Sequence, residues 1–128
     1  MSGRRRRRVG GVAAAALLAV GCTRSAEPAA VGKVAVGSPS MGRAAMVRYG
    51  CGSCHTIPGV EGAHALVGPP LVHFARRSYI AGELANTQDN LIRWVRDPKG
   101  VEPGTAMPDL GVTLDDARNI SAYLERLQ

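Results

Sequence analysis

The sequence predicts an all-α domain, because its periodic segments are all helical in pattern. Three segments carry a polar capping residue followed by apolar residues at helical spacing. No segment shows the alternation or the β-branched run that is typical of a strand. The stretch from Ser40 to Gln128 holds one phenylalanine, one tryptophan and three tyrosines, which is few for a core of that size. We therefore expect a bound group to fill part of the interior.

The first helix is expected immediately before a pair of cysteines. Ser40 can cap a short helix that runs through Tyr49, and Gly50 then stands where a left-handed residue favours a stop. A loop rich in glycine and proline follows from Ile57 to Pro70.

Two further helices are predicted by their caps. Thr87 can cap one that ends at Asp97-Pro98, since the residue before proline disfavours the helical conformation. Thr113, with Asp116 three residues later, gives a variant of the capping box for the last helix. The apolar faces are Leu91, Trp94 and Val95 in the former, and Ala117, Ile120, Leu124 and Leu127 in the latter.

Residues 1–21 are predicted to be a secretory signal peptide. The basic block Arg4–Arg8 precedes twelve small or apolar residues, Val9–Val20. Twelve residues are too few to span a bilayer, which takes about 20. The alternative is an uncleaved anchor or a basic tail. The signal peptide predicts an exported protein on the periplasmic side of a membrane.

Residues 22–39 are predicted to be a lipidated N-terminus and a flexible tether. The stretch Leu18–Cys22 resembles a bacterial lipoprotein signal, although Ala19 stands where a leucine is usual. From Thr23 to about Pro39 the chain is mostly Ala, Val, Gly, Pro and Ser. A lipid on Cys22 would make the protein a membrane-anchored lipoprotein. An unmodified Cys22 would instead be a free thiol open to intermolecular pairing.

Charge argues against a nucleic-acid partner once this leader is removed. The whole chain has a net charge of +6, but five of its 16 basic residues are Arg4–Arg8. From Cys22 onward, 11 basic residues therefore face 10 acidic ones. A nearly neutral protein lacks the sustained basic surface that binds nucleic acid.

The pentapeptide Cys51-Gly52-Ser53-Cys54-His55 has the spacing of c-type haem attachment. Two thiols three positions apart can add to the two vinyl groups of one haem, while the adjacent imidazole reaches its iron. A structural zinc site would need two more ligands, and the chain has only Cys22, His64 and His73 left to supply them. A dithiol redox motif would be expected beside a βαβ pattern, which is absent from the sequence. Residues 40–128 are therefore expected to form a single domain with one covalent haem c.

The second axial ligand of the iron has four candidates, because thioether and imidazole both suit haem iron. Met107 is favoured, since Pro103–Pro108 cannot be helical and would hold a side chain at a fixed point. Met46 lies mid-helix, where packing is the simpler role. His64 and His73 are expected in a loop and at the surface, and they remain alternatives.

Four motifs occur in the order found in class I cytochromes c, and the chain resembles that family from Gly50 to Leu127. They are Cys51–His55, Gly68–Leu71, Pro103–Pro108 and Ile120–Leu124. The similarity includes small bacterial members and the cytochrome c domain fused to subunit II of some haem–copper oxidases. The resemblance implies the small class I cytochrome c fold, wrapped around one covalent haem.

The resemblance also implies roles for individual residues. The Pro69 carbonyl would accept the His55 N–H and raise the basicity of that ring. Arg76 or Arg77, together with Tyr79, would meet the haem propionates, and Trp94 would lie over the haem near the methionine. Gly42 and Tyr123 would meet where the first and last helices cross, with the glycine admitting the aromatic ring.

A His/Met pair leaves no open position on the iron, which indicates an electron carrier and not an enzyme. The expected setting is a membrane-associated respiratory chain, with a terminal oxidase, a quinol-oxidising complex or a dehydrogenase as partner. Lys33 and Lys99 are the only lysines, so the lysine ring by which mitochondrial cytochromes dock is absent. The alternatives are a fixed electron-transfer subunit of a dehydrogenase or oxidase complex, and a haem peroxidase or gas sensor.

Overall fold

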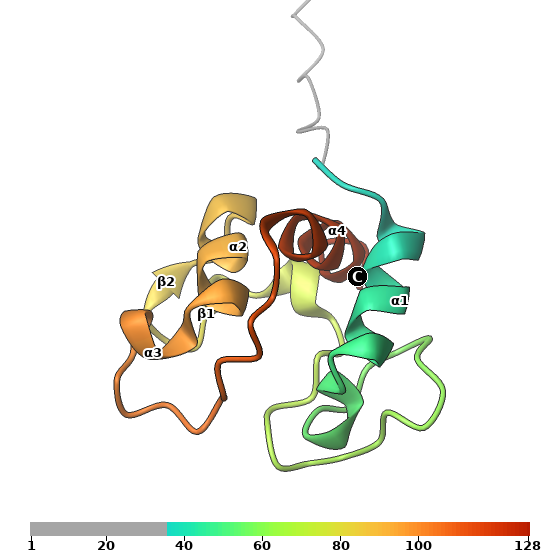
Figure 1. The fold of residues 1–128 in the computed structure, drawn as a ribbon, viewed down its shortest axis with the longest axis horizontal. Coiled ribbons are helices and arrows are strands. Elements are labelled where there is room, and N and C mark those ends of the chain that lie inside the picture. The colour runs from blue at the N-terminus through green and yellow to red at the C-terminus, as the bar shows by residue number, and fades with distance from the viewer. Residues whose placement is uncertain (1–35) are drawn as a thin grey trace, which may run out of the picture. The chain divides into compact units, whose positions relative to one another are not determined.

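The computed structural model describes residues 36–128. These residues form the helices α1 (Pro39–Arg48), α2 (Gln88–Arg96), α3 (Pro98–Val101) and α4 (Leu114–Leu124) (Figure 1). Single 3-10 turns at Cys51–Ser53 and Phe74–Arg76 and two strands, β1 (Tyr79–Ile80) and β2 (Leu84–Ala85), complete the order. The predicted signal peptide, the predicted lipidation site Cys22 and residues 22–35 of the predicted tether lie outside the described residues. No helix within residues 36–128 has the length and apolar character needed to cross a bilayer.

The all-α fold class is confirmed, with one correction. We expected no strand, and the structure pairs β1 with β2 as an antiparallel ladder of two residues each. The turn between them holds both Ala81 and Gly82 at positive φ, at 53° and 81°. A ladder this short lies below the length at which alternation can be recognised in a sequence.

The crossing of α1 and α4 is the main contact between helices, and both helices lie side by side in Figure 1. It depends on Gly42, which is buried in α1. A Cβ added at Gly42 would lie 2.0 Å from the Asn119 carbonyl oxygen and 3.0 Å from the Ile120 nitrogen. The two backbones therefore approach too closely for any side chain at this position.

The predicted crossing of the first and last helices at Gly42 is confirmed, and its closest contacts are to the backbone of α4. The atoms nearest to Gly42 belong to the α4 backbone and not to the Tyr123 ring. Tyr123 instead donates its hydroxyl to the Pro58 carbonyl oxygen at 2.5 Å, and a Cβ added at Gly59 would lie 2.6 Å from that hydroxyl. Tyr123 thus fastens the loop after the cysteine motif to α4.

The helices begin and end at capping residues near those predicted, but the cap of α1 lies two residues earlier than expected. The cap of α1 is Ser38 and not Ser40: Ser38 Oγ accepts from the Met41 N–H at 3.5 Å, and Pro39 takes the first helical position. Gly50 has the predicted left-handed conformation, with φ of 70°. Thr87 caps α2 as predicted, accepting from the Asn90 N–H at 3.3 Å.

Thr113 caps α4 as predicted, but Asp116 does not close a capping box. Thr113 Oγ1 accepts from the Asp116 N–H at 3.2 Å, while the Thr113 N–H donates to the Tyr49 hydroxyl at 3.4 Å. The Asp116 carboxylate accepts from Arg48 at 2.7 Å, and from the Tyr49 and Thr113 hydroxyls at 2.9 Å each. These bonds lower the pKa of Asp116, with the Arg48 hydrogen bond as the largest cause. The network ties the end of α1, directly before Cys51, to the start of α4.

The core combines the predicted helix faces with residues from the loops. Leu127, predicted on the stripe of the last helix, lies beyond the end of α4 and is partly buried. The buried apolar residues include Met46, Ile57, Phe74, Ile80, Leu91, Trp94, Val95, Ala117, Ile120 and Leu124.

Candidate haem site

A cavity of about 550 Å³ opens in the described domain, and its lining is mostly apolar. Its volume lies within the range of about 300–1,000 Å³ that is usual for ligand pockets. Eight of the nine residues proposed from the sequence line it together: Cys51, Cys54, His55, Pro69, Arg77, Tyr79, Trp94 and Met107. The ninth, Arg76, is exposed and is not among the lining residues.

The two cysteines are presented by the 3-10 turn that follows α1. The left-handed Gly50 redirects the chain, and the Ser53 hydroxyl donates to the Gly50 carbonyl oxygen at 2.7 Å. A Cβ added at Gly52 would lie 2.8 Å from the Ala63 Cβ, so the turn packs closely against the following loop. Both thiols are partly buried and free of a disulfide.

Burial raises the pKa of the Cys51 thiol. Redox-active Cys-x-x-Cys motifs show the opposite shift, because they stabilise a thiolate. Among residues 36–128, no group of three or more His, Cys, Asp or Glu side chains is placed to hold a metal ion. The dithiol and zinc alternatives therefore gain no support from the described part of the chain.

His55 is held with one ring nitrogen fixed and the other left available. Its Nδ1 lies 2.7 Å from the Pro69 carbonyl oxygen. A carbonyl can only accept, so Nδ1 carries a proton and donates, and the lone pair of the neutral tautomer is then on Nε2. His55 lines the cavity, so the neutral ring can offer Nε2 to an iron there.

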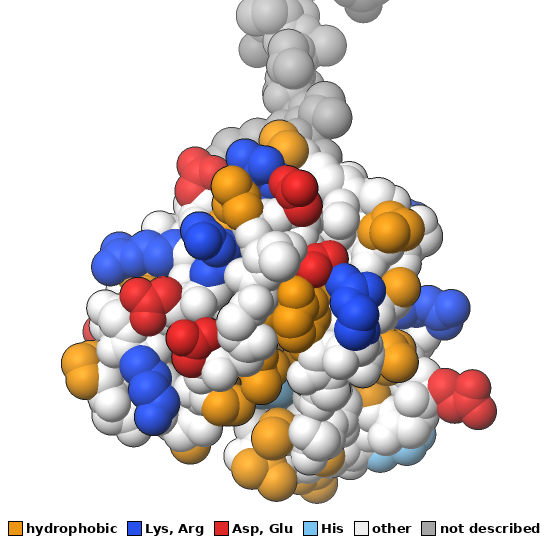
Figure 2. All heavy atoms as spheres, viewed as in Figure 1, with side chains coloured by type: hydrophobic (Ala, Val, Ile, Leu, Met, Phe, Trp, Pro, Cys, Tyr) orange, Lys and Arg blue, Asp and Glu red, His pale blue; other side chains and the backbone are white. Residues whose placement is uncertain are grey.

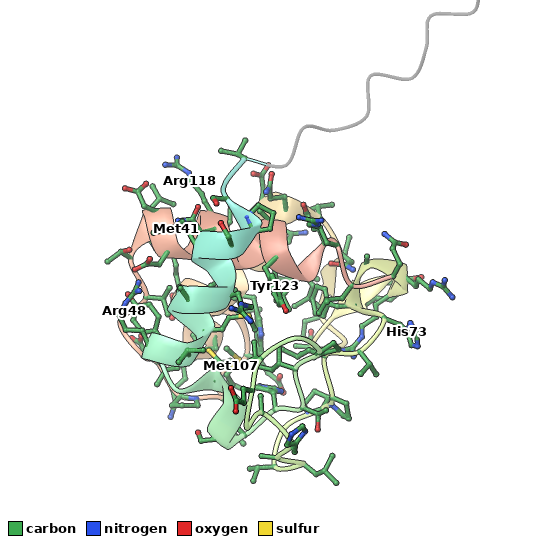
Figure 3. The ribbon with its side chains drawn as sticks, turned by 90° about the vertical axis from the view of Figure 1, so that its right-hand side faces the viewer. Met41, Arg48, His73, Met107, Arg118 and Tyr123 are labelled. Atoms are coloured by element: carbon green, nitrogen blue, oxygen red, sulfur yellow. The ribbon has the colours of Figure 1, made fainter. Side chains whose placement is uncertain are left out.

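Of the four candidates for a second axial ligand, only the two methionines line the cavity. Met46 is 1% exposed and is part of the core. His64 forms an isolated antiparallel β-bridge with Thr56. His73 donates from Nδ1 to the Gln128 carbonyl oxygen at 2.6 Å. Figure 3 shows His73 at the edge of the molecule, well apart from Met107.

Met107 is positioned by its own loop. Its N–H donates to Thr105 Oγ1 at 3.2 Å, and the Thr105 N–H donates to the Glu102 carbonyl oxygen at 3.0 Å. Pro108 follows Met107 and fixes its own φ, which disfavours a helical backbone at Met107. The thioether is partly buried against the core.

The sequence could not distinguish Arg76 from Arg77 as the propionate partner, and only Arg77 lies at the polar edge of the cavity. Arg77 lines the cavity, its guanidinium donates to the Pro70 and Val72 carbonyl oxygens, and it lies 5.1 Å from the centroid of the Phe74 ring. Tyr79 lines the same cavity from β1 and is 62% exposed. Trp94 is buried in α2 and contributes to the wall.

The residues present fit a covalent haem. Two thiols, an imidazole with a free Nε2 and a thioether share one apolar cavity of suitable volume. Two contacts of the proposed ligands were missed at the level of sequence. A Cβ added at Gly68 would lie 2.4 Å from Cε1 of the His55 ring, and Thr105 Oγ1 accepts from the Met107 N–H at 3.2 Å. A Gly-Pro pair indicates a turn, but the pattern does not tell which ring lies against it.

Comparison with known families identifies the domain. Residues 40–128 match the model of the cytochrome c family. The chain belongs to the cytochrome c family. The match confirms the predicted family resemblance and the predicted fold. The cofactor of this domain is a covalent c-type haem, as the sequence predicted. A cytochrome c domain carries electrons by means of its haem.

The relatives found are subunits 2 of cytochrome c oxidases. The chain is 33% identical over 90 residues to the subunit 2 of Alkalihalophilus pseudofirmus. The aligned residues cover 70% of this chain and 25% of the relative. It is 35% identical over 65 residues to that of a Bacillus species, covering 49% and 18%. It is 31% identical over 75 residues to that of Bacillus subtilis, covering 57% and 21%. The chain therefore spans a quarter or less of the length of these relatives.

Proposed function

We propose that this cytochrome c carries electrons with a haem attached to Cys51 and Cys54 and ligated by His55 and Met107. The observation that supports the proposal is the shared cavity, to which all four side chains contribute. The fixed Nδ1–H of His55 strengthens the case, because it leaves Nε2 as the only ring nitrogen that can ligate. The haem supplies a one-electron iron couple when bound.

The protein side chains tune that couple and exclude other chemistry. The Pro69 carbonyl polarises the His55 N–H and makes the ring a stronger donor. The neutral Met107 thioether favours ferrous iron and raises the reduction potential, and the apolar walls act in the same direction. Ligation by both His55 and Met107 would leave no position on the iron for a substrate, which supports a carrier and not a peroxidase, gas sensor or other enzyme.

The propionate role is assigned to Arg77 together with Tyr79, because both line the cavity and Arg76 does not. Arg77 is also held in place by the carbonyl oxygens of Pro70 and Val72. A fixed guanidinium can meet a carboxylate at little entropic cost.

The proposed setting is the outer face of a membrane, in a respiratory chain that ends at an oxidase. The relatives are oxidase subunits, which favours a terminal oxidase as electron acceptor. The predicted signal peptide would direct export, and a lipid on Cys22 with residues 22–35 of the predicted tether would hold the domain near such a partner. Residues 36–39 belong to the folded domain, since Ser38 caps α1 and Pro39 begins it. Charges of both signs are interspersed on the face shown in Figure 2, so docking need not depend on a single charged ring.

A second candidate is a fixed subunit of an oxidase complex, and the same relatives favour it. The carrier and the fixed subunit differ in whether the protein remains bound to the oxidase after mild detergent extraction. Co-purification in constant stoichiometry would support the fixed subunit, while separation would support the carrier.

The axial ligand is tested by replacing Met107. Met107→Ala in the haem-loaded protein should abolish the weak near-infrared sulfur-to-iron band of the oxidised form, lower the potential and open the iron to added ligands. Met41→Ala is the matched control, because Met41 is 55% exposed on α1 and does not line the cavity. An unchanged band in Met107→Ala would transfer the role to Met46, the other methionine that lines the cavity, whereas absence of the band from the wild-type protein would point to His64 or His73.

A further inference from the structure

We propose that Gly68 is a positioning residue for His55, and that the space left by its missing side chain sets the orientation of that ring. The inference rests on the proposed role of His55 as iron ligand. It concerns a steric requirement and not a conformational one, since Gly68 does not have a positive φ. A side chain at position 68 would thus be excluded by its neighbour alone.

The neighbour is the His55 ring itself. A Cβ added at Gly68 would lie 2.4 Å from Cε1, 2.7 Å from Nδ1 and 3.0 Å from Nε2 of that ring. With both nitrogens this close as well as the carbon between them, the added atom would press on the face of the ring and not meet it edge-on. Real Cβ atoms essentially never approach within 3.0 Å, so either the ring or the loop would have to move.

The loop is tied to the haem motif on both sides of the contact. The Gly68 N–H donates to the Cys54 carbonyl oxygen at 2.7 Å, and His55 Nδ1 donates to the carbonyl oxygen of Pro69 at 2.7 Å. A shift of the loop would strain the first bond, and a tilt of the ring would weaken the second. Either way, the hydrogen bond that polarises His55 is affected.

The direction in which the reduction potential of the iron changes can be derived. A weaker bond from Nδ1 to Pro69 makes the imidazole a poorer donor, and a poorer donor stabilises ferric iron less. The reduction potential should therefore rise.

The first experiment compares Gly68→Ala with Gly104→Ala in the haem-loaded protein. Gly104 is the matched control, because an added Cβ there meets nothing within 4 Å and its φ is not positive. We expect Gly68→Ala to raise the potential and to speed hydrogen exchange of the His55 Nδ1 proton by about fivefold to tenfold, while the control changes neither. A Gly68→Ala protein with wild-type potential and wild-type exchange would overturn the proposal.

A second measurement uses the wild-type protein and decides the question even where Gly68→Ala does not fold. In the ferrous form, the Gly68 α protons should show a nuclear Overhauser contact with the His55 Cε1 proton. Absence of this contact would overturn the proposal. Failure of the underlying ligand assignment is recognised separately, because His55 ring protons would then lack the large ring-current shift of an iron-bound imidazole.

Discussion

Gly42→Ala is the substitution whose effect on the fold follows most directly from the structure. The added methyl group would lie 2.0 Å from the Asn119 carbonyl oxygen and 2.5 Å from its carbon. Both are backbone atoms of α4, so no rotamer change can relieve the contact. Restoring an ordinary separation of 3.4 Å requires α1 and α4 to move apart by roughly 1.4 Å.

The size of the effect is the balance of two terms. Overpacking costs about 1–3 kcal/mol, and the rigid neighbours place Gly42→Ala at the upper end of that range. Alanine returns about 1 kcal/mol through its better helix propensity. The net loss of about 2 kcal/mol corresponds to a fall in Tm of about 8–16 °C for a domain of this size.

Thermal unfolding of the haem-loaded protein, followed by far-ultraviolet circular dichroism, measures this fall. Gly104→Ala adds the same methyl group where an added Cβ meets no atom within 4 Å, and should leave Tm within about 2 °C of wild type. A Gly42→Ala protein as stable as wild type would refute the reasoning. It would mean that the helices separate at no cost, and that their close approach contributes nothing to stability.

The remaining predictions concern the haem, pH and the membrane. The haem should stay with the protein after denaturation and acid–organic extraction, because thioether bonds to Cys51 and Cys54 survive unfolding; passage of haem into the organic phase would contradict attachment. The lowered pKa of Asp116 means that its contribution to stability is complete above the ordinary aspartate pKa of about 3.9 and is lost as pH falls through the lower native value. Asp116→Asn should thus flatten the decline of Tm in acid, whereas Asp115→Asn, at a side chain 88% exposed, should not. Cys22→Ser, exported through a substituted cleavable leader, should appear in the soluble periplasmic fraction; retention on membranes at wild-type levels after a high-salt wash would exclude a lipid on Cys22 as the anchor.

Helix ends could be predicted where the capping signal is local. Thr87, Thr113 and Gly50 act within their own turn, so a short stretch of sequence contains the whole signal. Ser38 was missed as the cap of α1, and its position also depends on a distant partner. Its N–H donates to Asn119 Oδ1 at 2.8 Å, across 81 positions of the chain.

The short strands show a different limit. Each of β1 and β2 has two residues, so no periodicity can develop. Ala81, in the turn between them, adopts a positive φ that alanine rarely takes, which hides the turn from a search for glycine or asparagine. Tertiary contacts, and not the local pattern, determine this hairpin.

Some residues of the haem site could likewise be predicted from a local motif, whereas others depend on the folded structure. Cys51, Cys54 and His55 form a contiguous motif, and the chemistry of the haem dictates their spacing, so the sequence alone could predict them. The choice between Arg76 and Arg77 could not be made, because it depends on where the 3-10 turn ends. Arg77 follows that turn with an extended backbone, at φ of −75° and ψ of 143°, and lines the cavity.

The two proposed ligands differ in how firmly the protein restrains them, and this difference bears on function. His55 is confined by its bond to Pro69, by contact with Gly68 and by the covalent bonds proposed for Cys51 and Cys54. The bonds described for Met107 come from its own loop, through Thr105. Segments with few restraints open at the lowest free energy. The segment around Met107 is therefore where we expect the iron site to yield first. Substitution of Thr105, whose hydroxyl accepts the Met107 N–H, would change the potential without disturbing haem attachment.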